Sequence, residues 1–485
     1  MCKLQRRSFL CCETMSPQNI QVTSGRTFLG EPRGLAYLAF TEAWERFSYY
    51  GMTALLVLYM SGQLFLPGHV EHVAGFASFR AALEGLFGPM TPVALASQIF
   101  GLYTGFVYFT PVFGGIIADR WIGKRNAVVI GALLMSAGHI AMAFDQSFLG
   151  ALLLLVIGCG LLKGNISAQV GALYAEGDGA GRTRGFAIFS TAINIGAVAG
   201  PLACGLLAQV YGWHAGFGLA GVLMLIGLAT YLSGYRALAA ETHEAASGVE
   251  VPAVEKQGQA RVVWALVFVM FITIFQSIAY YQNSNIALVW INDHANLDLF
   301  GFAVPVAWFN SIDPFVSIVS VPVLFAFWRW QQRHGGEPGE LGKIATGAWI
   351  ACVANLLLVI ASWLPGRAHV LFPALYDVLL GVAFIYYWPT LLALVSLAAP
   401  RGLKSTLIGV VFLTLFISNI TIGRLGGSYE KLGPTSFWML HAVIAATGGV
   451  LALVFGRRLT QVLEEGAAAS PDSRAASPAG ELEPV

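Results

Sequence analysis

The sequence predicts an all-α polytopic membrane protein with twelve membrane-spanning helices. Hydrophobic residues make up 56% of the 485-residue chain and charged residues only 11%, against about 25% charged residues in soluble proteins. A soluble domain could not bury so much apolar surface. Runs long and apolar enough to cross a bilayer lie near 35–60, 93–117, 127–144, 148–172, 186–209, 215–235, 262–284, 302–327, 344–364, 372–397, 405–427 and 436–456.

The basic residues predict the orientation of these spans, because cytoplasmic loops of membrane proteins are enriched in Lys and Arg. With a cytoplasmic N-terminus, all but six of the 27 Lys and Arg residues fall on the inside. The exceptions are Arg80, Arg367, Arg424 and Lys431 outside, with Arg46 and Lys163 in the membrane. We therefore expect an even number of spans and two cytoplasmic termini. The net charge of +1 gives no reason to expect a nucleic-acid partner.

A polar interior stretch divides the chain into two halves of six spans each. This linker, residues 236–261, is too short and too polar to hold further helices. Two six-helix bundles are the arrangement of the major facilitator fold, here with no extra helices between them. We expect a cytoplasmic tail at 1–34, bundles at 35–235 and 262–457, and a disordered cytoplasmic tail at 458–485.

The first span carries three charged residues in an otherwise apolar helix. On an α-helix, Glu42, Glu45, Arg46 and Tyr49 fall within an arc of about 100°. An ionised group at this depth is costly and usually marks a function. A structural i,i+4 pair of Glu42 with Arg46 is the plainer interpretation, but it leaves Glu45 unexplained. We therefore expect this face to have a function beyond a structural ion pair.

Two further charged residues at membrane depth extend this hypothesis. Lys163 in the fourth span needs an anionic partner, and Glu45 or Glu42 are the nearest candidates in the same half. This pair could be purely structural, or it could break when a proton binds and form again when the proton leaves. Asp313 precedes the helix-breaking Pro314, and burial would favour its neutral form. Asp313 is therefore a candidate proton site.

The connection after the second span contains Asp119 and Arg120. An acid here can cap a neighbouring helix in one conformation and release it in another, so both residues are candidates for gating. The long outside loop at 62–92 can hold a short surface helix, and its His69 and His72 show no metal-site spacing.

Residues 42–51 closely resemble the Glu-x-x-Glu-Arg-Phe-x-Tyr-Tyr-Gly signature of the proton-dependent oligopeptide transporter family. Segments 162–167, 186–196 and 212–218 resemble further motifs of its first half, and 311–314 and 389–400 are recognisable in its second half. The chain is identified as a bacterial-type member. The resemblance implies a monomer in the bacterial inner membrane that imports di- and tripeptides with protons, and no cofactor.

By this resemblance, Glu42, Glu45 and Arg46 would couple protons and gate the transporter, and Lys163 would face the substrate with Tyr50 and Tyr108. We extend the expected substrate site to other polar and aromatic residues at similar depth. These are Tyr49, Asn165, Gln276, Tyr280, Trp308, Asn310 and Trp388. For each single Tyr or Trp, packing or an interfacial belt is the more common role.

The chain departs from the family pattern at several charged positions. Thr53 stands where a second Arg is usual, and Gln276, or Gln282 in another alignment, stands where helix 7 has a Glu. Phe384 replaces a Glu, Val411 replaces a Trp, and Asp313 replaces an Asn; these three replacements are read from the same alignment. Because a surviving partner would be a lone buried charge, we expect the outer gate to lack its customary ion pair.

These departures keep two alternatives open: proton-coupled uptake of an amino acid or a nitrate-like anion, and a non-transporting peptide sensor. An enzyme is not expected, because the sequence contains no His-Glu-x-x-His motif and no nucleophile elbow.

Overall fold

The computed structural model describes residues 28–175, 178–238, 256–400 and 403–468. Most of the expected linker and most of both expected tails lie outside these residues. The first half contains α1 (Arg33–Tyr59), α2 (Phe76–Phe87), α3 (Pro92–Ile117), α4 (Lys124–Ala141), α5 (Phe148–Ala172), α6 (Gly179–Tyr211) and α7 (Trp213–Gly234). The second half contains α8 (Lys256–Tyr281), α9 (Ile286–His294), α10 (Ile312–His334), α11 (Glu340–Trp363), α12 (Leu371–Ala398), α13 (Lys404–Gly426) and α14 (Tyr429–Ala468).

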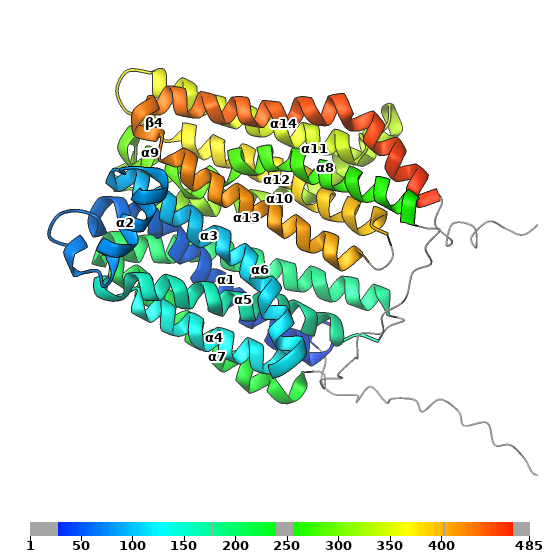
Figure 1. The fold of residues 1–485 in the computed structure, drawn as a ribbon, viewed down its shortest axis with the longest axis horizontal. Coiled ribbons are helices and arrows are strands. Elements are labelled where there is room, and N and C mark those ends of the chain that lie inside the picture. The colour runs from blue at the N-terminus through cyan, green and yellow to red at the C-terminus, as the bar shows by residue number, and fades with distance from the viewer. Residues whose placement is uncertain (1–27, 176–177, 239–255, 401–402, 469–485) are drawn as a thin grey trace, which may run out of the picture.

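The helices form two bundles that lie side by side (Figure 1). Ten of the described helices are long and apolar enough to cross a membrane. The other two long helices are α1, which carries the three charges at mid-length, and α4, which begins with Lys124-Arg125. With these two, the all-α, twelve-helix fold class is confirmed. The short helix α2 lies in the long loop at 62–92, as the sequence allowed.

Glycine brings the helices of the first bundle into close contact. The face of α6 that carries Gly196 and Gly200 packs on α1, where a Cβ at either glycine would overlap a main-chain oxygen of α1. Gly51 of α1 fits against Cys204 of α6 in the same way. Such small residues let two backbones approach within a membrane bundle, so this packing fixes the position of the charged face of α1.

The segment between α8 and α10 differs from the sequence-based expectation. The expected span at 302–327 begins instead as a strand of a hairpin, β2 (Asp298–Leu299) with β3 (Phe302–Ala303), followed by a 3-10 turn (Val306–Ser311). Phe300 and Gly301 at the tip have positive φ angles of 52° and 82°, typical of a tight two-residue turn. Gly301 and Pro305 explain why an apolar run does not continue as helix.

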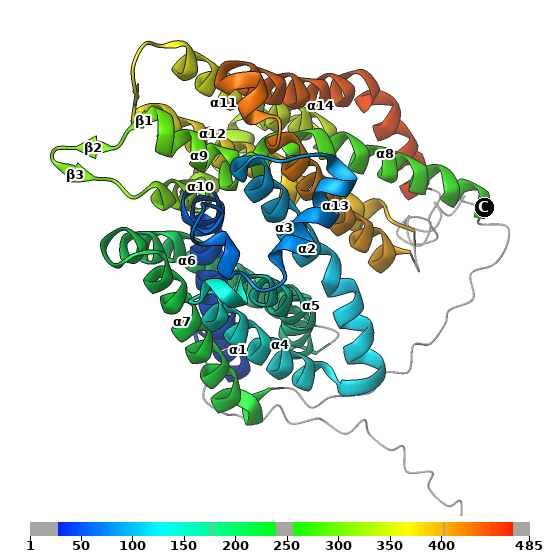
Figure 2. The same cartoon turned by 60° about the vertical axis from the view of Figure 1, so that its left-hand side comes forward.

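This hairpin projects from one end of the molecule (Figure 2). A second small sheet at the same end pairs β1 (Ala295–Asn296) in parallel with β4 (Ala368–His369). We call this end the hairpin side, and the end where α1 begins and α14 finishes the tail side. The expected outside loop before the hairpin also contains α9, whose residues 286–291 are buried.

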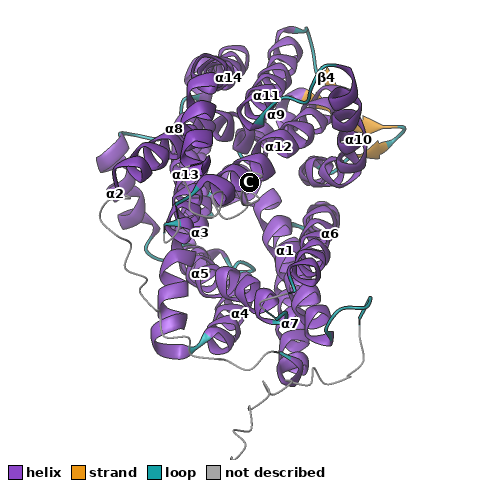
Figure 3. Ribbon diagram, turned by 90° about the vertical axis from the view of Figure 1, so that its right-hand side faces the viewer, coloured by secondary structure: helices purple, strands orange, loops and turns teal. Residues whose placement is uncertain are grey.

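Hydrogen bonds between the two bundles gather on the hairpin side. Trp308 Nε1 donates to the Leu202 carbonyl at 2.8 Å, and Ser311 Oγ donates to the Val198 carbonyl at 2.7 Å. Gln209 Nε2 donates to the Ala303 carbonyl at 2.8 Å. We name this contact, α6 residues 198–209 against residues 303–311, the hairpin-side closure. Seen from the tail side, the bundles surround a central region (Figure 3).

Candidate functional site

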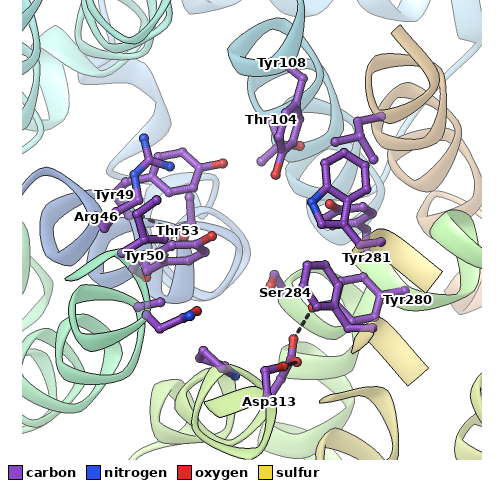
Figure 4. A pocket seen from close by; sticks show the side chains of 18 of the residues that line it. Arg46, Tyr49, Tyr50, Thr53, Thr104, Tyr108, Tyr280, Tyr281, Ser284 and Asp313 are labelled. Atoms are coloured by element: carbon purple, nitrogen blue, oxygen red, sulfur yellow. Dashed lines mark hydrogen bonds between the residues drawn. The ribbon is translucent and has the colours of Figure 1, made fainter. Parts of the chain in front are cut away.

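A cavity of about 530 Å³ lies between the bundles. Its walls come from α1, α3, α5 and α6 on one side and from α8, α10, α12 and α13 on the other (Figure 4). The volume is in the range of sites for small ligands, about 300–1,000 Å³. Because the bundles meet in the hairpin-side closure, we interpret the cavity as one approached from the tail side.

The charged face of α1 forms a buried cluster at the cavity wall. Arg46 Nε lies 3.1 Å from Glu42 Oε1 and is also paired with Glu45 Oε2. The three residues are at most 3% exposed, and Glu42 and Arg46 line the cavity while Glu45 lies behind them. The guanidinium also lies 5.3 Å from the centre of the Tyr49 ring, a cation–π contact. One arginine therefore compensates two acids, and protonation of either acid would change its pairing.

Lys163 does not form the ion pair with Glu42 or Glu45 that the sequence suggested. Among the described residues no acid lies within ion-pair distance of it; instead its Nζ lies 4.5 Å from the centre of the Tyr108 ring. Both side chains line the cavity. A cation held by an aromatic face keeps its capacity to pair with an anion. Lys163 is therefore available to pair with an anion in the cavity.

Asp313 is the acidic group of the opposite wall. It accepts a hydrogen bond from the Tyr280 hydroxyl, and Asn283 Nδ2 and Ser317 Oγ lie at 3.4 and 3.5 Å from its oxygens. It also sits in the first turn of α10, where the helix dipole favours a negative charge. No described Lys or Arg of the second half is buried. Among the described residues Asp313 therefore has no ion-pair partner, and its carboxylate can accept a proton or pair with a cation in the cavity.

The structure separates the other expected substrate residues into two groups. Those that line the cavity are Tyr49, Tyr50, Tyr108, Tyr280, Asn310 and Trp388. Asn165, Gln276 and Trp308 do not line it, and their amide or indole nitrogens donate to main-chain carbonyls. Gln282, the alternative counterpart of Gln276, contacts His441 at 3.1 Å in the bundle interior. Buried polar side chains on helices commonly serve packing in this way.

The expected gating residues lie away from the cavity. Asp119 is exposed on the tail side, 3.8 Å from Lys124 Nζ, and Arg120 is exposed beside it. No side chain caps the start of α4 in this conformation. At the other gate, Thr53 bonds the main chain of its own helix. No ion pair between described residues joins the two bundles.

Several cavity residues were not among the residues expected to form the substrate site, although Ser167, Asn194 and Asn283 are polar residues within predicted spans or at their ends. They include Thr104, Ser167, Ser190, Asn194, Asn283, Ser284, Phe384 and Phe412. In the sequence, Phe384 is identified only as a position where the chain differs from the family pattern. The others are single hydroxyl, amide or ring groups, which carry no pattern until the facing helices are known. In the described chain, no group of three or more His, Cys, Asp or Glu side chains could hold a metal ion.

Two six-helix bundles enclosing a charged central cavity define a membrane transporter of the major facilitator type. The POT family model matches residues 125–244 and 238–430, more than half of the chain. The protein belongs to the POT family.

The relatives span nearly the whole chain. It is 28% identical to "Peptide transporter YePEPT" of Yersinia enterocolitica, over 90% of this chain and 96% of that protein. It is 26% identical to a "Di-/tripeptide transporter" of Lactococcus lactis subsp. cremoris, over 92% and 99%. The crystal structure of a peptide transporter POT in complex with alafosfalin matches with a TM-score of 0.76 at 26% identity, covering 90% of this chain and 97% of that one.

Proposed function

We propose that this protein is a proton-coupled symporter that imports di- and tripeptides by alternating access. The observation that carries the proposal is the separation of charge across the cavity, with Lys163 and Arg46 on one wall and Asp313 on the other. A peptide zwitterion presents a carboxylate and an ammonium group to such a site. The peptide-transporting relatives named above support the same conclusion.

Proton coupling is assigned to the cluster on α1. Arg46 is held by two buried acids, Glu42 and Glu45. Protonation of one acid would remove one of the attractions on the guanidinium and let the wall of the cavity rearrange. A ligand or proton shifts a two-state equilibrium only through such differential contacts. The peptide carboxylate would bind Lys163, and its amino group would bind Asp313.

We place the tail side in the cytoplasm of a bacterial inner membrane, with both termini inside, because of the bias of Lys and Arg toward that side. The conformation described above is then open toward the cytoplasm. We further propose that the transporter works as a monomer without a cofactor, protons being the coupling ion.

The test is uptake of labelled Ala-Ala into proteoliposomes with an acidic exterior. We expect Glu45→Ala and Lys163→Ala to abolish accumulation but to spare counterflow in whichever variant still binds the peptide. Glu464→Gln, exposed near the end of α14, is the matched control and should transport normally. Unimpaired accumulation in both variants would refute the coupling scheme. Displacement of Ala-Ala by nitrate or a single amino acid, but by no tripeptide, would refute the assigned substrate class.

A further inference from the structure

The two walls of the cavity differ in chemistry. The wall from the first half is polar, with Glu42, Arg46 and Lys163 among tyrosine and hydroxyl side chains. On the wall from the second half, Asp313 is the one charged group among the described residues that line the cavity. Much of the remaining surface of that wall is aromatic or aliphatic. The first wall also has aromatic rings, but Arg46 lies over Tyr49 and Lys163 lies over Tyr108. The second wall therefore offers aromatic surface that no described cation of the cavity lining covers.

Four side chains form a continuous aromatic row on this second wall: Tyr280, Phe384, Trp388 and Phe412. The Tyr280 and Phe384 rings are stacked with centroids 5.5 Å apart, and Phe384 and Trp388 are stacked at 6.5 Å. Phe412 meets Trp388 edge-on at 6.0 Å. Phe384, Trp388 and Phe412 are only partly buried, and all four residues line the cavity. The row thus leaves ring surface open to a ligand.

One end of the aromatic row lies next to Asp313. Tyr280, its first member, donates its hydroxyl hydrogen bond to this carboxylate. On α12, Gly381 packs against the Asp313 carbonyl, which a Cβ would meet at 2.8 Å. Phe384 and Trp388 follow three and seven residues later, so at about 1.5 Å per residue the row continues along α12 toward the tail side. If the amino group of a peptide binds Asp313, the side chain of the N-terminal residue of that peptide would lie over this row.

We propose that the aromatic row is a side-chain subsite that makes the transporter prefer peptides with an aromatic or large aliphatic N-terminal residue. This inference rests on the proposed function, in which the amino group meets Asp313. Stacked rings offer a second ring favourable offset or edge-on contacts in addition to apolar burial. A Lys side chain could also lie over the rings, but the described residues that line this wall include no second acid to neutralise it, so apolar side chains fit better.

Competition binding to the full-length protein in detergent tests the subsite with Phe-Ala, Ala-Phe, Lys-Ala and Ala-Ala. We expect Phe-Ala to bind about ten- to thirtyfold tighter than Ala-Ala. Ala-Phe, whose ring lies at the other end of the peptide, should gain less. Phe384→Ala should remove most of the Phe-Ala advantage while leaving Ala-Ala binding within about twofold, which also shows that the variant is folded.

Phe384→Leu retains most of the volume and should keep a reduced preference, because burial remains while stacking is lost. Phe271→Ala, on the exposed face of α8, is the matched control and should leave the ranking unchanged. Equal losses for Phe-Ala and Ala-Ala in Phe384→Ala, or tighter binding of Lys-Ala than Phe-Ala, would overturn the subsite. Absence of Ala-Ala binding and transport by the unmodified protein would instead refute the proposed function.

Discussion

The hairpin-side closure supports a quantitative prediction about the conformational equilibrium. Two of its hydrogen bonds, Trp308 Nε1 to the Leu202 carbonyl and Ser311 Oγ to the Val198 carbonyl, can be removed with little change of shape. Trp308→Phe keeps an aromatic ring against Phe302 and deletes the donor. Ser311→Ala deletes a hydroxyl. Both acceptors are carbonyls of α6, so the changes act on the contact between the bundles.

Each hydrogen bond contributes about 1 kcal/mol net. Trp308 and Ser311 are neighbours on one 3-10 turn, so the sum of about 2 kcal/mol is an upper value for the pair. At about 1.4 kcal/mol per tenfold change, the closed hairpin side should lose between about fivefold and thirtyfold in population relative to the open one. Among the described residues no ion pair joins the bundles, but other hydrogen bonds do, including those from Thr91 to Glu430 and from Ser97 to the Gly423 carbonyl. The two bonds removed here therefore supply one part of the stability of the closed hairpin side.

Pulsed electron paramagnetic resonance can measure this shift. Spin labels at Tyr211 and Trp363, both exposed on the hairpin side, report the separation of the bundles once Cys2, Cys11 and Cys12 are replaced by serine. We expect the double variant to add a longer-distance population that is minor in the parent. Trp264→Phe with Ser233→Ala, both exposed and remote from the closure, should leave the distribution unchanged. An unchanged distribution in the double variant would refute the assignment of the closure to these bonds.

Three further predictions concern charge and packing. Asp313→Asn should weaken Ala-Ala binding about ten- to hundredfold, since a charge-assisted hydrogen bond is lost; N-acetyl-Ala-Ala should be affected far less in the same calorimetric titration, and equal effects would argue against an amine site. Glu45→Gln leaves Arg46 with one acid and should lower the melting temperature, whereas Glu464→Gln at the exposed end of α14 should not. Gly114→Ala places a Cβ into the Gly160 carbonyl and should destabilise by about 1–3 kcal/mol; Gly164→Ala, which meets nothing within 4 Å, should be neutral or stabilising.

The sequence contained the evidence for the fold class and for the ionised part of the site. Both follow from the cost of burial, because apolar runs must lie in lipid and charges such as Glu42, Glu45 and Arg46 are tolerated there only when they are paired. The same reasoning selected Asp313 and Lys163, which the structure places on opposite walls of one cavity.

The sequence was less informative wherever the outcome depends on a neighbour from another helix. Asn165, Gln276 and Trp308 have the same polar character as Asn310 or Asn194, yet only the latter two reach the cavity. Lys163 lies over Tyr108 rather than beside an acid because α3 and α5 bring the two together. Hydropathy also extended a span into the hairpin, where Gly301 and Pro305 interrupt the helix.

By itself, then, the sequence determined a twelve-helix membrane protein with a charged first helix, since the cost of burying charge acts on each residue alone. The tertiary structure decided which groups face the cavity, how the hairpin side closes without an ion pair between described residues, and that an aromatic row follows Asp313. These features arise where helices distant in sequence pack together, and Phe384 acquires its role only beside Tyr280 and Trp388.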